Sequence, residues 1–137
     1  MKLFLIILIS LPKSLSSDNS LRVNEESPNL VPENVIVTLT TYVPNQKETD
    51  SSPHITASGF KIDTSNPKKH RIIAISRDLK RKWGFNKKVR IRKAGKYNGV
   101  YVIKDLMNKR FKKSVDILVS EDDKPIKLKN VQISLIK

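Results

Sequence analysis

The apolar residues of this 137-residue chain fall into short runs that are rich in Val and Ile and separated by turn-forming residues. Short runs of this kind predict β-strands, and no apolar pattern is long enough for a long helix. Short helical connections are expected over 78–83 and 106–112. The pattern is typical of a small all-β barrel of about six strands. The expected strands cover residues 34–43, 71–76, 88–92, 100–104, 115–119 and 128–136.

The first 16 residues differ in composition from the rest of the chain. A basic start and an apolar run over 3–11 are followed by Pro12 and several small serines. This order is typical of a cleaved secretory signal peptide, and the run is too short for a membrane span, which needs roughly 20 residues. A buried N-terminal strand is the alternative. We therefore expect an exported protein, periplasmic or extracellular, with no membrane span after cleavage. Its parts are a signal peptide over 1–16, a polar linker over 17–33 and a folded domain over 34–137.

The charge of the chain is strongly positive and unevenly distributed. There are 27 Lys and Arg residues against 13 Asp and Glu residues, which gives a formal net charge of +14. Residues 61–113 hold 19 of the basic residues and only three acidic ones. Such an excess predicts an anionic partner. The chain has no Cys, which excludes disulfides, thiol nucleophiles and iron–sulfur sites. His54 and His70 lack the spacing of metal ligands, so neither a metal nor another cofactor is expected.

Two aspartates occupy unusual places in the expected strands. Asp105 directly follows one strand, and Asp116 lies between Val115 and Ile117 inside another. Asp is depleted in strands. A carboxyl group in apolar surroundings has a raised pKa, which suits a general acid at neutral pH. The alternative is a structural role, in which Asp116 pairs with one of the many cations or caps a loop.

The order of several segments resembles the double-psi β-barrels of the RlpA-like and three-aspartate (3D) domain families. The resemblance covers about residues 34–137, and the eleven-residue step from Asp105 to Asp116 matches the spacing of two of the aspartates that name the 3D families. It implies a six-stranded double-psi β-barrel. The matching segments are Tyr42 and residues 56–59, 71–79, 89–91, 99–105 and 115–120.

This resemblance implies a lytic transglycosylase that acts on peptidoglycan glycan strands. Asp116 takes the position of the general acid, which protonates the glycosidic oxygen between N-acetylmuramic acid and N-acetylglucosamine. The C6 hydroxyl of the muramyl sugar then attacks its own C1 and gives a 1,6-anhydro product. Asp105 takes the position of a second carboxylate that orients or tunes the acid. The resemblance also places four residues along the sugar groove or in the loop beside it, namely Thr41, Tyr42, Thr56 and Ser58.

The chain departs from the 3D pattern at two places. Where those families carry their first aspartate this chain has Ser76, and the nearest carboxylate is Asp78, which we include among the substrate-binding candidates. Bulky and basic residues follow Asp105. A non-catalytic peptidoglycan-binding or wall-loosening module is therefore the alternative function. In either case the expected partner is peptidoglycan or another anionic wall polymer, bound by a monomer. Nucleic acid is not expected, because aromatic residues for base stacking are few.

Overall fold

The computed structural model describes residues 32–44 and 54–137, which fall within one compact unit, Pro32–Lys137. The expected signal peptide and nearly all of the expected linker lie outside the described residues. In the part that is described, no helix has both the length and the apolar character needed to cross a membrane.

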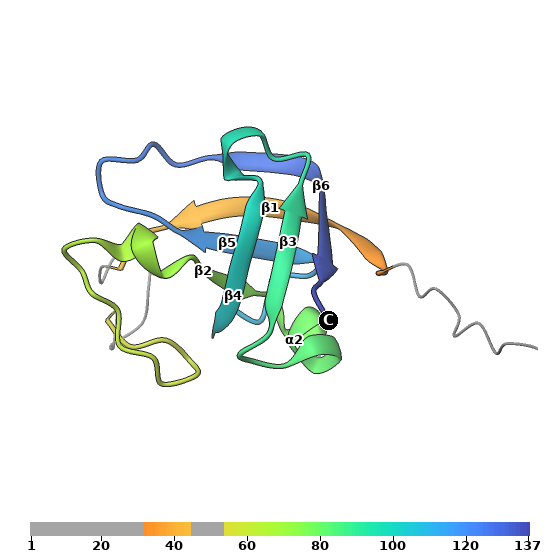
Figure 1. Cartoon of the computed structure of the whole chain (residues 1–137), viewed down its shortest axis with the longest axis horizontal. Helices are drawn as coiled ribbons and strands as arrows, with labels where there is room; N and C mark the ends of the chain where they lie inside the picture. Colours follow the sequence, from red (N-terminus) through yellow and green to blue (C-terminus); the bar gives the residue numbers. More distant parts are fainter. Residues whose placement is uncertain (1–31, 45–53) are drawn as a thin grey trace, which may run out of the picture. The chain divides into compact units, whose positions relative to one another are not determined.

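Six strands of the described chain close into a barrel (Figure 1). Their order around the barrel is β1-β5-β2-β4-β3-β6. The pairs β1–β5 and β2–β4 are parallel and the other four are antiparallel, so the barrel is mixed. The expectation of a six-stranded, mostly β barrel is confirmed. The strands are β1 (Asn34–Tyr42), β2 (Ile72–Ile75), β3 (Lys88–Arg92), β4 (Gly99–Leu106), β5 (Ser114–Leu118) and β6 (Lys127–Leu135).

Helical segments are short and lie between the strands. The α-helix α2 (Arg77–Trp83) agrees with the expected helical turns over 78–83. It ends at Gly84, whose φ of 78° is easily adopted only by a residue without a side chain. Two 3-10 helices were not expected from the sequence, η2 (Pro67–His70) and η3 (Gly95–Tyr97).

The expected helix over 106–112 is wrong. Leu106 still belongs to β4, and the backbone N–H of Met107 donates to the carbonyl of Ile75, 3.0 Å away. The side chain of Asn108 then accepts a hydrogen bond from the N–H of Arg110 at 3.0 Å. A side-chain acceptor of this kind competes with helical hydrogen bonding and favours a turn. The segment is therefore a strand end followed by a turn.

The interior of the barrel is filled by alternate residues of all six strands. In β3, for example, the buried Val89 and Ile91 alternate with three exposed cations. This is the period-two pattern of a strand with one face in a core. Burial of each such side chain contributes about 1.5–3 kcal/mol. The interior residues include Leu39, Ile73, Ile75, Val89, Ile91, Ile103, Val115, Ile117, Val131 and Ile133.

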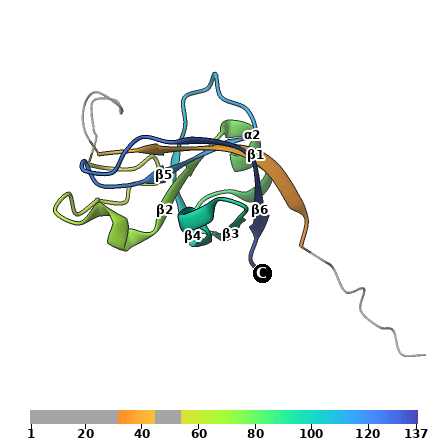
Figure 2. The ribbon, with the colours of Figure 1, turned by 90° about the horizontal axis from the view of Figure 1, so that it is seen from above.

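A second apolar cluster lies on the outside of the barrel, over β2. All four residues of β2 are buried, because Ile73 and Ile75 face the interior while Ile72 and Ala74 belong to the outer cluster. Segment 54–70 covers this outer face, and both views show it in yellow and green at the end of the barrel where β2 begins (Figures 1 and 2). The outer cluster consists of Tyr42, Ile62, Ile72, Ala74, Met107 and Leu118, with Phe60 and Phe111 packed against it.

Candidate functional site

The two aspartates singled out in the sequence lie in one row on the outer face of the barrel. Ala74 of β2 is in register with Asp116 of β5 on one side and with Asp105 of β4 on the other. Asp116 is also in register with Thr40 of β1. Residues in register on neighbouring strands project to the same face. The two aspartates are thus two strands apart, which places their Cα atoms about 10 Å from each other.

An irregularity in β4 turns Asp105 toward this face. Ile73 is in register with Ile103, whereas the next residue, Ala74, is in register with Asp105, so that Lys104 is the extra residue. Without this shift Asp105 would have the parity of Ile103, which points into the barrel core. An extra residue of this kind re-aims the side chains that follow it. The bulge therefore moves a carboxylate from the interior side to the outer row.

Asp105 is held by three hydrogen bonds. The Tyr42 hydroxyl donates to its Oδ2 at 3.0 Å. The backbone N–H groups of Ala57 and Leu106 both donate to Oδ1, each at 2.9 Å. All three partners are donors, so Asp105 acts as a hydrogen-bond acceptor in each contact. It connects β4 to the end of β1 and to the loop that carries Ala57.

Asp116 and Asp105 act electrostatically on the same tyrosine. The hydroxyl of Thr40 donates to Asp116 Oδ1 at 2.9 Å. Burial raises the pKa of Tyr42 well above its ordinary value, and the charges of Asp105 and Asp116 and the hydrogen bond to Asp105 raise it further. The phenol therefore stays neutral and serves as a donor to Asp105.

We predict that Tyr42 ionises well above pH 10, the ordinary value for a tyrosine, in the folded protein. In the unfolded chain a tyrosine releases its proton near pH 10, whereas folded Tyr42 keeps it because its pKa is raised. The folded state then binds more protons above pH 10, so its stability falls as the pH rises. An alkaline titration followed by phenolate absorbance checks this, because Tyr42→Phe should remove an ionisation step that lies above pH 10. Loss of a step at pH 10 or below would contradict it.

Thr56 and Ser58 shape the loop beside Asp105. Their hydroxyl oxygens lie 3.0 Å apart and share a hydrogen bond. The N–H of Phe60 donates to Thr56 Oγ1 at 3.1 Å, and the N–H of Ser58 donates to the carbonyl of Lys104 at 3.1 Å. These contacts fix the turn that points the Ala57 amide at Asp105.

Thr41 is not part of the row, although it is adjacent to Tyr42. Successive residues of a strand project to opposite faces. Thr41 Oγ1 instead accepts a hydrogen bond from the N–H of Ile126 at 3.3 Å. Thr40, which sequence reasoning missed, contacts Asp116. Alternate residues of β1 project to the same face, so Thr40 and Tyr42 lie on the outer face and Thr41 does not. The alternating sequence of β1 could have indicated this.

Asp78 is engaged elsewhere, at the start of α2. Its Oδ2 accepts a hydrogen bond from the N–H of Lys113 at 3.0 Å. Burial would raise the pKa of Asp78, but hydrogen bonds from the Ser76 side chain and from the Lys113 backbone outweigh this effect and lower the pKa. The partner in this hydrogen bond, Lys113, is not a member of the row that holds Asp105 and Asp116. Asp78 instead connects α2 to the segment before β5.

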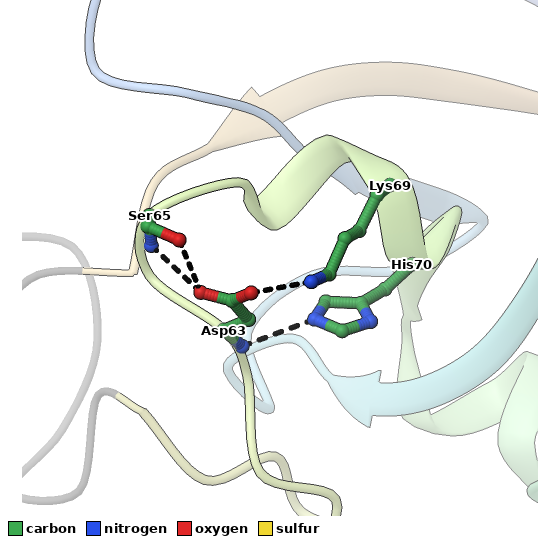
Figure 3. Close-up of polar contacts among 4 residues, drawn as sticks. All are labelled: Asp63, Ser65, Lys69 and His70. Carbon is green, nitrogen blue, oxygen red and sulfur yellow. Dashed lines mark hydrogen bonds and ion pairs between the residues drawn. The ribbon is translucent and has the colours of Figure 1, made fainter.

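A second group of polar side chains shapes segment 63–70 (Figure 3). Asp63 accepts hydrogen bonds from the N–H and hydroxyl of Ser65, at 3.0 and 2.6 Å, and forms an ion pair with Lys69. The hydrogen bonds from Lys69 and Ser65 hold the pKa of Asp63 well below its ordinary value. His70 Nε2 accepts a hydrogen bond from the N–H of Asp63 at 3.0 Å. These contacts are local to the segment. Over residues 32–44 and 54–137, no three His, Asp or Glu side chains gather as metal ligands do.

The chain was also compared with known proteins. No family model, no curated protein and no solved structure matches it. Evidence for the function of this chain therefore comes from the residues of the barrel. Within the described residues, the strongest chemical feature is the outer row with Asp105, Asp116 and Tyr42.

Proposed function

We propose that this protein is exported and cleaves the glycan strands of peptidoglycan as lytic transglycosylases do, with Asp116 as the general acid. The observation that carries the proposal is the placement of Asp105 and Asp116 on one outer face, on either side of Ala74 and beside Tyr42. Paired acid groups in glycan-cleaving enzymes are separated by about 5–10 Å. Export follows from the composition of residues 1–16.

The proposal includes a double-psi topology for the barrel. The two parallel pairs are β1–β5 and β2–β4, and β5 of the first pair lies next to β2 of the second. In the sequence, β2 and β4 both lie between β1 and β5, so the connection of the second pair is nested within that of the first. Each parallel pair needs a connection that crosses the barrel end. Two nested crossovers of this kind support the topology that the sequence resemblance implies.

The division of roles between the carboxyl groups follows from their hydrogen bonds. Asp105 accepts from three donors and is therefore unsuited to give up a proton. Asp116 accepts a hydrogen bond from Thr40 and is the proposed donor, because the sequence resemblance gives it the position of the general acid. Tyr42 and the loop at Ala57 are held by Asp105 and border the site.

In the proposed reaction, Asp116 gives its proton to the glycosidic oxygen while the bond from that oxygen to C1 of the muramyl sugar breaks. The C6 hydroxyl oxygen of the same sugar forms a bond to C1. Its proton returns to the Asp116 carboxylate, which restores the acid. No water is consumed, so one well-placed carboxyl group suffices for both proton transfers.

Digestion of purified sacculi tests the proposal. The full mature chain is incubated with sacculi, and the soluble products are separated and identified by mass spectrometry. We expect muropeptides that end in 1,6-anhydromuramic acid. Products with only reducing ends, or no soluble products from a folded protein, would rule out the proposed activity.

One observation favours a second function, non-catalytic binding to the wall. The exposed face of β3 carries Lys88, Arg90 and Arg92 in alternation with buried residues, which makes a cationic strip on the barrel surface. Such a strip attracts anionic polymers in a salt-dependent manner. Co-sedimentation with sacculi that falls with salt, is unaffected by Asp116→Asn and releases no products would assign the protein to this function.

A further inference from the structure

A cavity of about 180 Å³ lies at the end of the barrel where β5 ends and β2 and β4 begin. Its charged and aromatic lining consists of Lys68, Arg71, Lys96, Tyr97, Tyr101 and Asp123. Tyr101 precedes Asp105 by four residues of β4, which corresponds to about 13 Å along a strand. Its lining contains neither Asp105 nor Asp116, although Ile117 and Leu118 of the lining directly follow Asp116 in β5.

The cavity has an excess of positive charge. Its single carboxylate, Asp123, already accepts a hydrogen bond from the N–H of Ser120 at 3.0 Å and lies 3.1 Å from Lys68 Nζ. These contacts keep the pKa of Asp123 below its ordinary value, so it stays charged and paired with Lys68. Among the described residues, no carboxylate forms an ion pair with Arg71 or Lys96. Arg71 is thus available to an anion, and Lys96 adds a second positive charge that also acts on Asp123.

The guanidinium group of Arg71 is held in place. The residue has a left-handed backbone conformation, with φ of 52° and ψ of 46°. Its Nε donates to the carbonyl of Val100 at 3.2 Å, and its Cζ lies 4.1 Å from the centroid of the Tyr101 ring. Stacking and the Nε bond fix the plane of the guanidinium. A side-chain hydrogen bond from Arg71 also acts on the Tyr101 hydroxyl, and the guanidinium has further N–H donors for a ligand. A donor that is already ordered loses little entropy when it binds a ligand.

Gly99 makes room for this arrangement. Its φ is 139°, and a Cβ atom added there would lie only 2.6 Å from a terminal nitrogen of Arg71. Both the backbone conformation and the close approach require a residue without a side chain. Gly99 is therefore a positioning residue for Arg71.

We propose that this cavity binds the carboxylate or phosphate group of a small, sugar-sized ligand. Arg71 recognises two oxygens of the group through its planar guanidinium, and Lys96 supplies a second positive charge. The volume exceeds that of a lone anion and is smaller than the 300–1,000 Å³ or so of pockets for drug-sized ligands. This binding site is independent of glycan cleavage at Asp116.

The test is an NMR titration of the full mature chain with three matched sugars at constant ionic strength. Glucose carries no charge, D-glucuronate carries a carboxylate and glucose 6-phosphate carries a phosphate. We expect saturable shifts of the Tyr101 and Val119 amide signals with at least one charged sugar and none with glucose. The tighter of the two charged sugars identifies the oxyanion. No saturable binding of either, or equal binding of glucose, would overturn the proposal.

Variants locate the binding. Arg71→Gln and Lys96→Gln are each expected to weaken the affinity for the charged sugar at least about tenfold. Arg77→Gln removes the same charge from the exposed start of α2 and should leave the affinity unchanged. Lys96 is exposed in η3, so its replacement keeps the fold even where Arg71→Gln fails to. Equal weakening by Arg77→Gln would show a general charge effect and overturn the proposal.

Discussion

Asp116→Asn is expected to lower the rate of glycan cleavage at least about 100-fold, the lower end of what a general acid contributes. Asn has nearly the shape of Asp and can still accept the hydrogen bond from Thr40. It has no carboxyl proton to give to the leaving oxygen. The measurement is the initial rate at which 1,6-anhydromuropeptides are released from purified sacculi.

Asp122→Asn provides the matched control for this variant. Asp122 is exposed in the turn before β6, and its replacement removes one negative charge without touching the outer row. We expect it to cleave at the rate of the unaltered protein. If Asp116→Asn also keeps the full rate, Asp116 is not the acid. If both variants lose activity equally, the effect comes from the overall charge.

Ile73→Ala is expected to reduce the free energy of unfolding by about 2–5 kcal/mol. Ile73 is fully buried inside the barrel and lies in register with Ile103 of β4 and Ile117 of β5. Its truncation removes apolar contacts with both neighbours and leaves a cavity that the closed barrel cannot collapse. Urea unfolding followed by the fluorescence of Trp83, the single tryptophan, measures the loss.

The same substitution at an exposed position separates burial from strand propensity. Ile36 of β1 is 48 % exposed, so Ile36→Ala should cost about 1 kcal/mol or less. Ile73→Val, with an expected cost of about 0.5–1.5 kcal/mol, gives a measurable transition if Ile73→Ala does not fold. Equal costs for Ile36→Ala and Ile73→Ala would contradict the assignment of Ile73 to the interior.

The local pattern of apolar residues predicted the positions of most strands. Alternating apolar residues mark β3 and β6, and the short apolar run before α2 marks β2. The sequence pattern did not predict which strands pair with each other. The pairing of β1 with β5, for example, joins Thr40 to Asp116, 76 positions apart. The helix expected over 106–112 failed because the Asn108 side chain favours a turn, an effect that apolar spacing does not reveal.

The site was partly accessible to sequence reasoning. The resemblance pointed to Asp105 and Asp116, and the structure brings both to one face. The bulge at Lys104, which turns Asp105 outward, depends on the pairing of β4 with β2 and leaves no local signal. The cavity at Arg71 was missed for a similar reason, since its cations come from segments that meet only in the closed barrel.

Cleavage of sacculi in water enriched in oxygen-18 tests the central claim most directly. Attack by the sugar's own C6 hydroxyl consumes no water, so we predict 1,6-anhydromuramyl products that carry no oxygen-18. With Asp116→Asn the same products must form at least about 100-fold more slowly. Products that carry oxygen-18 at a new reducing end would mean hydrolysis by water. That result would contradict the proposed chemistry of the Asp105–Asp116 row.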